Sequence, residues 1–348
     1  MFFFRPCTPY MKLIYLTRIF VTLTLLLSAC SNSDIDTSKV PLQLKFHRFD
    51  KALQAIDTNN VMTGLLKLQA QHPHFTNRWT EHLLGSGMIA SDTSVMLATG
   101  VRHFLTYKDY VQLQKTINAK FPNTNAIDKD ITSLCKHVKY YVPKFKCNTV
   151  YYFSSGLNRY STITDDTIIG IGLDMFLGKD YEFYPAVQIP KYMIDKCEPE
   201  QIIPMLARTI FTNEFTYNEM NKDLLTVMIN RGREIYFGSK VAPNIAERSF
   251  YNYNADQEDW CKKYEGRLFG EISKFLYETD PQKVMPIVTD GPSTPGMPLQ
   301  CPGNVGTWIG YQIVKKYMDK NPKLTLEQLC MMDVDGSKFL EASGYKPR

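Results

Sequence analysis

The chain has 348 residues, of which 44% are hydrophobic, and its 40 basic and 35 acidic residues give a formal net charge of +5 at pH 7. This length allows one large domain or two smaller ones, each with its own core. The small charge excess excludes a strongly basic nucleic-acid-binding protein, because such proteins neutralise phosphates with clustered Lys and Arg.

The first 29 residues have the features of a secretory signal peptide. Three basic and no acidic residues precede an apolar run at residues 19–27, and small residues lead from this run to Cys30. The run is shorter than the roughly 18–20 residues of a membrane span, which is the alternative. The order Leu27-Ser28-Ala29-Cys30 resembles a bacterial lipobox, which implies cleavage before Cys30 and acylation of this cysteine. We therefore expect a mature chain of formal charge +2 that a lipid anchor holds to the membrane.

Residues 46–348 are expected to form a single domain whose N-terminal half is helical. They follow a lipidated tether at residues 30–45, which is mostly polar and lacks periodicity. From residue 60 to residue 141, apolar residues recur three and four positions apart, which predicts four or five amphipathic helices. The apolar stripes include Leu65, Leu68, Phe75, Trp79, Leu83, Ile131, Leu134 and Val138.

A small sheet is predicted at about residues 148–175. The segments 149–153, 160–164 and 167–173 are rich in β-branched and aromatic residues, and Asp165-Asp166 between the last two is typical of a hairpin turn. We therefore expect a largely antiparallel sheet within an α+β fold that is mostly helical.

Helices are predicted again in the C-terminal half. Apolar spacing predicts helices after Pro199, from about residue 224, over a long stretch at residues 256–277, and at residues 305–319. Residues 290–303 contain several prolines and glycines and are expected to form a loop. Thr325 and Gln328 form a capping box for a further helix, and Gly344 can close a last short one.

The sequence contains no strong catalytic motif. Gly170 and Gly172 follow a predicted strand, but Met175 occupies the third glycine position of a dinucleotide fingerprint, so close packing explains them better. All six histidines precede Lys139, and no spacing among them favours a metal site. The six cysteines after Cys30 are widely spaced, which leaves disulfides open. We expect no cofactor and no bound metal.

The C-terminal sequence Cys301-Pro-Gly-Asn-Val-Gly-Thr-Trp-Ile-Gly-Tyr-Gln-Ile-Val314 resembles the GldB family of gliding-motility-associated lipoproteins of Bacteroidetes. Weaker likenesses at residues 46–50, 140–143, 176–180 and 343–347 extend the resemblance over nearly the whole mature chain. Within this block, Gly306 and Gly310 lie on one helix face and permit close approach of another element, and Trp308 offers a large anchor. A core helix with small residues explains the block equally well.

The GldB family is in turn similar to predicted zinc metallopeptidases, which carry HExxH on one helix and a third, acidic ligand on the next. The resemblance implies a zincin-type scaffold and aligns these motifs with residues 208–212 and 231–234. Arg208 and Arg231 occupy these segments, and shifting the alignment by a residue brings no histidine into either of them. Zinc ligation therefore does not carry over, and the scaffold is expected to lack its metal.

These observations favour a non-catalytic envelope lipoprotein that supports gliding or secretion machinery through protein partners. The candidate cleft or partner surface comprises Arg208, Arg231, Glu234 and Trp308. Two alternatives stay open: a metal-independent hydrolase that uses Glu214 or Glu234, and a module that binds a peptide or glycan in the former cleft. The lipid anchor predicts the outer membrane and leaves its periplasmic and surface faces open.

Overall fold

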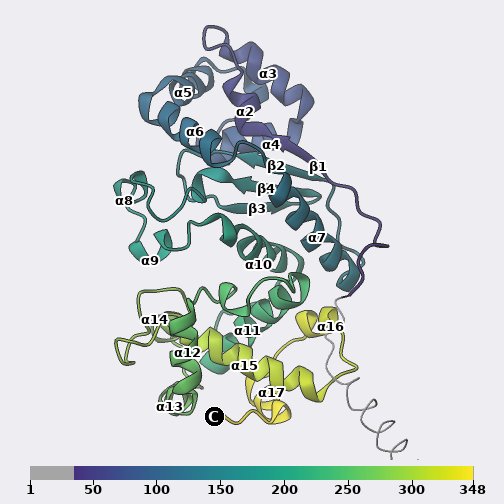
Figure 1. Ribbon diagram of the computed structural model, residues 1–348, viewed down its shortest axis with the longest axis vertical. Coiled ribbons are helices and arrows are strands. Elements are labelled where there is room, and N and C mark those ends of the chain that lie inside the picture. Colours follow the sequence, from purple (N-terminus) through teal and green to yellow (C-terminus); the bar gives the residue numbers. More distant parts are fainter. Residues whose placement is uncertain (1–34, 348) are drawn as a thin grey trace, which may run out of the picture. The chain divides into compact units, whose positions relative to one another are not determined.

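A small mixed sheet lies among helices in the computed structural model, which describes residues 35–347. Its four strands are β1 (Lys45–Arg48), β2 (Thr149–Phe153), β3 (Thr162–Asp165) and β4 (Ile168–Gly172), in the order β1-β2-β4-β3. The expected mostly helical α+β fold is confirmed (Figure 1). Residues 1–34, including the predicted signal peptide and Cys30, lie outside the described residues.

The prediction of a largely antiparallel sheet was wrong. β1 pairs with β2 and β2 pairs with β4 in parallel, and only β3 and β4 are antiparallel. The predicted turn at Asp165-Asp166 does join β3 to β4, and Asp166 has a positive φ of 46°. Local pattern identified this hairpin, but it carried no signal for β1, which pairs with a strand about a hundred residues later in the chain.

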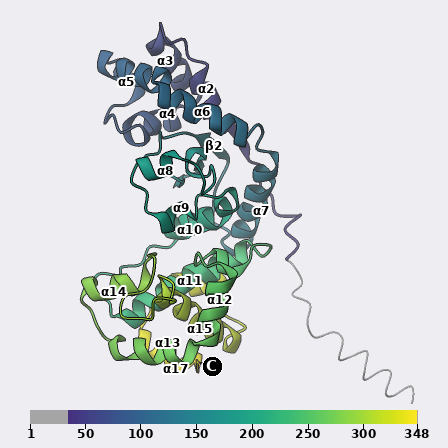
Figure 2. The same cartoon turned by 60° about the vertical axis from the view of Figure 1, so that its left-hand side comes forward.

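The two faces of the sheet are covered by different sets of helices. The side chains of β2 alternate, so that Tyr151 and Phe153 join one buried cluster while Val150 and Tyr152 join the other. The first cluster includes residues of α2 (Phe49–Gln54), α3 (Val61–Gln71), α4 (Pro73–Arg78) and α5 (Val95–Thr106). The second includes residues of α6 (Lys108–Lys120), α7 (Asn125–Tyr141), α10 (Ile202–Glu214), α11 (Leu224–Val241) and α15 (Val305–Lys320). Of this set, α7 and α10 lie next to the sheet, and α11 and α15 lie farther from it (Figure 2).

The remaining helices are short. They are α8 (Phe183–Ala186), α9 (Lys191–Ile194), α12 (Ala255–Lys263), α13 (Glu265–Ile272), α14 (Pro281–Val288), α16 (Leu326–Met331) and α17 (Gly336–Ser343). The long helix expected at residues 256–277 is instead divided at Tyr264, whose φ and ψ of −113° and 18° end α12. The capping box of Thr325 and Gln328 is confirmed, and so is the left-handed Gly344 at the end of α17.

Glycines allow α11 and α15 to touch backbone to backbone. Gly232 on α11 meets Gly310 on α15, and a Cβ at Gly310 would overlap the carbonyl oxygen of Met228. Gly306, one turn earlier, lies against Ile287 of α14. The sequence-based expectation that Gly306 and Gly310 permit close approach is therefore confirmed, and this contact fixes α11, which carries much of the candidate site.

The cysteines at 135, 147, 197, 261, 301 and 330 are buried free thiols. Within residues 35–347, no helix combines the length and the apolar character that a membrane crossing requires.

Candidate functional site

Two adjacent helices, α10 and α11, position the candidate site. Ile202, Leu206 and Ile210 bury one face of α10 in the core. α11 begins at the N-cap Asp223, whose side chain accepts a hydrogen bond from the Thr226 amide, and it is buried on most of its surface. A buried helix must pair any charge that it carries, because an unpaired buried charge is very costly. Glu234 on α11 is such a charge, with only 4% of its side chain exposed.

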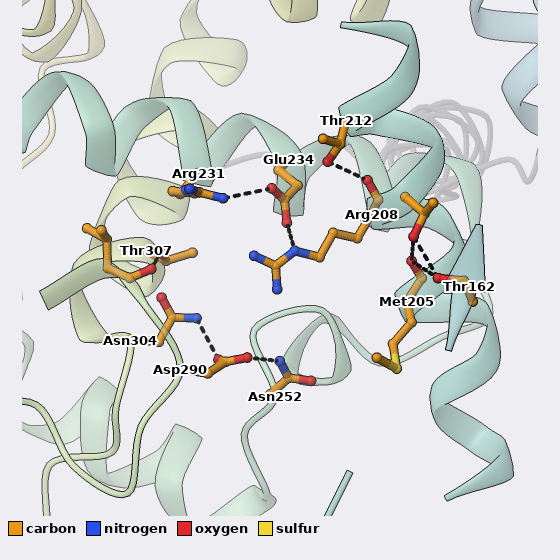
Figure 3. A network of polar contacts seen from close by, with 12 residues as sticks. Thr162, Met205, Arg208, Thr212, Arg231, Glu234, Asn252, Asp290, Asn304 and Thr307 are labelled. Atoms are coloured by element: carbon orange, nitrogen blue, oxygen red, sulfur yellow. Dashed lines mark hydrogen bonds and ion pairs between the residues drawn. The ribbon is translucent and has the colours of Figure 1, made fainter. Parts of the chain in front are cut away.

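Glu234 lies between two guanidinium groups (Figure 3). Its Oε1 is 2.7 Å from Arg208 Nε, and its Oε2 is 3.7 Å from Arg231 Nη1. Arg231 Nη2 also donates to Glu219 Oε2 at 2.7 Å. We call these four residues the arginine–glutamate cluster. It contains two positive and two negative charges, so the buried Glu234 and the partly buried Glu219 each have a partner of opposite charge.

Burial and charge act in opposite directions on Glu234. Burial raises the pKa of its carboxyl group, and the charges of Arg208 and Arg231 oppose this rise. The same pairing raises the pKa of Arg208, chiefly through Glu234. The side chain of Arg208 is nevertheless 45% exposed, because its outer part faces a cavity rather than the core. The arginine–glutamate cluster therefore extends from the buried Glu234 to Arg208, which faces the cavity.

A second polar group surrounds Asp290, below Arg208 in Figure 3. Its carboxylate lies 3.2 Å from Lys196 Nζ and accepts hydrogen bonds from the amides of Asn252 and Asn304 at 3.1 and 3.2 Å. Asn252 and Asn304 have φ of 61° and 66°, a left-handed conformation that Asn tolerates better than most residues. Burial lowers the pKa of Lys196, and the Asp290 charge opposes this shift.

Two cavities meet at the Asp290 group. One is about 280 Å³ and reaches Arg208 and the edge strand β3, and the other is about 460 Å³ and extends toward α12 and the loop before α15. Lys196, Asn252 and Asp290 line both cavities. We call the smaller one the Arg208 cavity and the larger one the tyrosine cavity, because Tyr192, Tyr251 and Tyr253 line it.

The residues at the expected zinc positions do not fit a zinc ion. Thr209 Oγ1 lies 2.6 Å from Thr162 Oγ1 of β3, and Thr212 Oγ1 donates to the Arg208 carbonyl at 3.0 Å. A guanidinium group has no free lone pair to give a metal and stays protonated in proteins. Within residues 35–347, no group of three or more His, Cys, Asp or Glu side chains could hold a metal ion.

The structure brings together three of the residues named from the sequence and separates the others. Arg208, Arg231 and Glu234 form one cluster. Trp308 is only 1% exposed and packs in the core, so its expected place at a cleft or partner surface was wrong. Glu214, at the end of α10, lines a separate small cavity.

The Asp290 group was not predicted from the sequence. Lys196 and Asp290 are far apart in the chain, and neither belongs to a recognisable spacing. The one available signal was the Asp290-Gly291-Pro292 sequence at the start of a loop, which predicts a turn and says nothing about charge partners.

Fold and site together define a mostly helical α+β protein with a buried arginine–glutamate cluster beside an open pair of cavities. The family model described as gliding motility protein GldB matches residues 30–347, and the chain belongs to this family of gliding-motility-associated proteins. The family's short name, GldB_lipo, suggests lipoproteins, and the match begins at Cys30. No curated protein and no solved structure matches the chain, so the zincin-type scaffold stays a prediction.

Proposed function

We propose that the protein is a non-catalytic lipoprotein of the cell envelope, anchored in the outer membrane through Cys30, that supports gliding or secretion machinery by binding other proteins. Membership of the GldB family supports the link to gliding, and the lipobox supports the anchor. Several acyl chains hold a protein firmly, because each buried CH₂ contributes about 0.8 kcal/mol.

The pairing of Glu234 is the observation that carries the non-catalytic assignment. A general base must be free to take a proton from substrate or water. Oε1 of Glu234 is instead paired with Arg208 at 2.7 Å. Oε2 lies 3.7 Å from Arg231 and makes no hydrogen bond, but the carboxylate is almost completely buried and therefore out of reach of a substrate. Glu214 lines a different cavity and does not complete an acid–base pair with it.

An activity screen with two variants tests this assignment. We expect the purified lipoprotein to leave peptide and glycan substrates intact. The Glu214→Gln and Glu234→Gln variants should behave in the same way as the wild type. Substrate cleavage that either variant abolishes would instead support the metal-independent hydrolase. Stoichiometric zinc in the purified protein would also contradict the proposal, because the arginine-occupied site offers it no ligands.

Partner binding has its own test. Affinity purification from detergent-solubilised envelope should recover the same envelope proteins in repeated preparations. Recovery of the lipoprotein alone, even after mild chemical cross-linking in whole cells, would count against a role that depends on protein partners.

The anchor is tested with Cys30→Ala. This variant removes the thiol that acylation requires, so we expect an uncleaved precursor or a protein released from the membrane fraction. A serine variant of the buried Cys330 serves as control and should keep normal acylation. Normal incorporation of labelled fatty acid into the Cys30→Ala protein would contradict the proposed attachment site.

A peptide- or glycan-binding module is the second candidate. The observation that favours it is the pair of adjoining cavities beside the arginine–glutamate cluster, which together offer an extended path for a ligand. This candidate is compatible with a non-catalytic role, since a partner protein can supply the bound segment.

A further inference from the structure

We infer that the Arg208 cavity binds a carboxylate-bearing segment of a partner polypeptide, with an aliphatic side chain beside the carboxylate. This inference rests on the proposed function in one respect, namely that the protein acts by binding other proteins.

Positive charge predominates in the lining of the Arg208 cavity. Arg159, Lys196 and Arg208 contribute cations, and Asp290 is the one acidic residue among the lining residues. Lys196 and two amides already compensate Asp290 at 3.1–3.2 Å. An entering anion therefore meets Arg159 and the outer part of Arg208 as the positive groups with spare hydrogen-bonding capacity.

Arg208 is held in a fixed orientation for such an anion. Its Nε is tied to Glu234, which restrains the plane of the guanidinium group. Its two terminal nitrogens make no hydrogen bond to any described residue, and they point into the space above Asp290 and Asn252 (Figure 3). A planar fork of two N–H donors matches the two oxygens of a carboxylate, and an orientation fixed in advance reduces the entropy lost on binding.

The cavity also has an apolar, adaptable wall, part of which comes from α10, the helix that carries Arg208. Met175, Met193 and Met205 line it together with Ile189 and Phe250. Methionine side chains are flexible and fill irregular gaps, so this wall can accommodate an aliphatic side chain of variable shape. A glycan bound in the Arg208 cavity would be expected to stack on an exposed aromatic face, but Phe250, the aromatic residue that lines this cavity, is only 7% exposed. The combination of a carboxylate clamp and a methionine wall therefore favours a peptide.

The adjoining tyrosine cavity provides room for the rest of the segment. It shares Lys196, Asn252 and Asp290 with the Arg208 cavity, and it is also lined by Gln201, whose amide oxygen has no hydrogen-bond partner among the described residues. Amide groups can bond the main chain of an extended peptide whatever its sequence. The Arg208 cavity would then supply selectivity for the acidic and aliphatic side chains, and the tyrosine cavity would hold the backbone.

An array of immobilised 12-residue peptides tests the inference with the full-length lipoprotein in detergent. Each peptide has one Glu flanked by Leu or Ile, and each has a twin in which Gln replaces Glu. We expect the Glu peptides to bind at least about tenfold more tightly than their twins, which is the size expected for hydrogen bonds to a charged group. Equal binding of the twins, or preferential binding of glycan fragments, would overturn the inference.

Variants of the cavity make the test specific. Arg208→Gln should remove the preference for Glu, whereas Arg102→Gln should leave it unchanged, because Arg102 is exposed on α5 and does not line the cavity. If Arg208→Gln does not fold, Met193→Glu gives an independent answer. Met193 is 38% exposed, so a charge is tolerated there, but it would repel the ligand carboxylate and should abolish binding.

Failure of this inference can be distinguished from failure of the proposed function. If envelope proteins co-purify equally with the wild type and with Met193→Glu, partner binding stands and the Arg208 cavity is not its site. If no envelope protein co-purifies and substrates are cleaved, the proposed function itself is wrong.

Discussion

Replacing Glu234 by Gln tests the arginine–glutamate cluster most sharply. Gln keeps the size of the side chain and removes its charge, so Arg208 and Arg231 lose their shared counter-ion. Removal of one partner from a fully buried ion pair costs about 3–5 kcal/mol. We expect about 2 kcal/mol here, because water screens the 45% exposed Arg208 and Arg231 keeps its pair with Glu219.

Urea unfolding of the detergent-solubilised protein measures this change through tryptophan fluorescence, since Trp308 is buried in the same core. The matched control is Glu271→Gln, which removes an exposed pair with Lys274 and should leave the free energy of unfolding unchanged. A double-mutant cycle with Arg208→Gln should give a coupling energy of about 1 kcal/mol or more. An unfolding free energy that stays the same, or rises, in Glu234→Gln would refute the reasoning.

Two further predictions concern the scaffold. Gly310→Ala should lower the free energy of unfolding in urea by several kcal/mol, because its Cβ would overlap the backbone of Met228. The control Gly270→Ala, on an open helix face, should be neutral or slightly stabilising. Equal effects of the two substitutions would disprove the close contact between α11 and α15. Burial lowers the pKa of both His47 and His72, so the unfolded chain binds more protons, and stability should fall as pH falls below about 6.5. His72→Gln should make the free energy of unfolding less dependent on pH. A free energy of unfolding that is constant from pH 7.5 to 5.5, or an equal pH dependence in wild type and His72→Gln, would contradict the role given to these histidines.

The sequence predicted the helices better than the sheet because their signals are local. The apolar stripes of residues 60–141 correspond to α3 to α7, and the capping box at Thr325 lies where a helix begins. Strand β1 has only four residues, and its parallel partner lies about a hundred residues away. No turn connects the two strands, so the direction of pairing depended on tertiary packing that local pattern does not encode.

The candidate site was predictable only in part, for a similar reason. Family resemblance pointed to Arg208, Arg231 and Glu234 on two successive helices, and the ion pairs between these helices followed from the fold. Trp308 was misjudged because a large aromatic residue suits a core and an interface equally well. The pairing of Asp290 with Lys196 was not predicted, because loops bring the two residues together and the geometry of a loop cannot be read from residue spacing.

The central claim, that the Arg208 cavity is a site for protein partners, is tested most directly by site-specific photo-cross-linking in living cells. A photoreactive residue at position 193, in the wall of the Arg208 cavity, is predicted to capture a discrete envelope protein. The same residue in place of Val95, which is highly exposed and lines neither the Arg208 cavity nor the tyrosine cavity, should not capture this protein. Capture of the same protein from Val95 and none from Met193 would contradict the account.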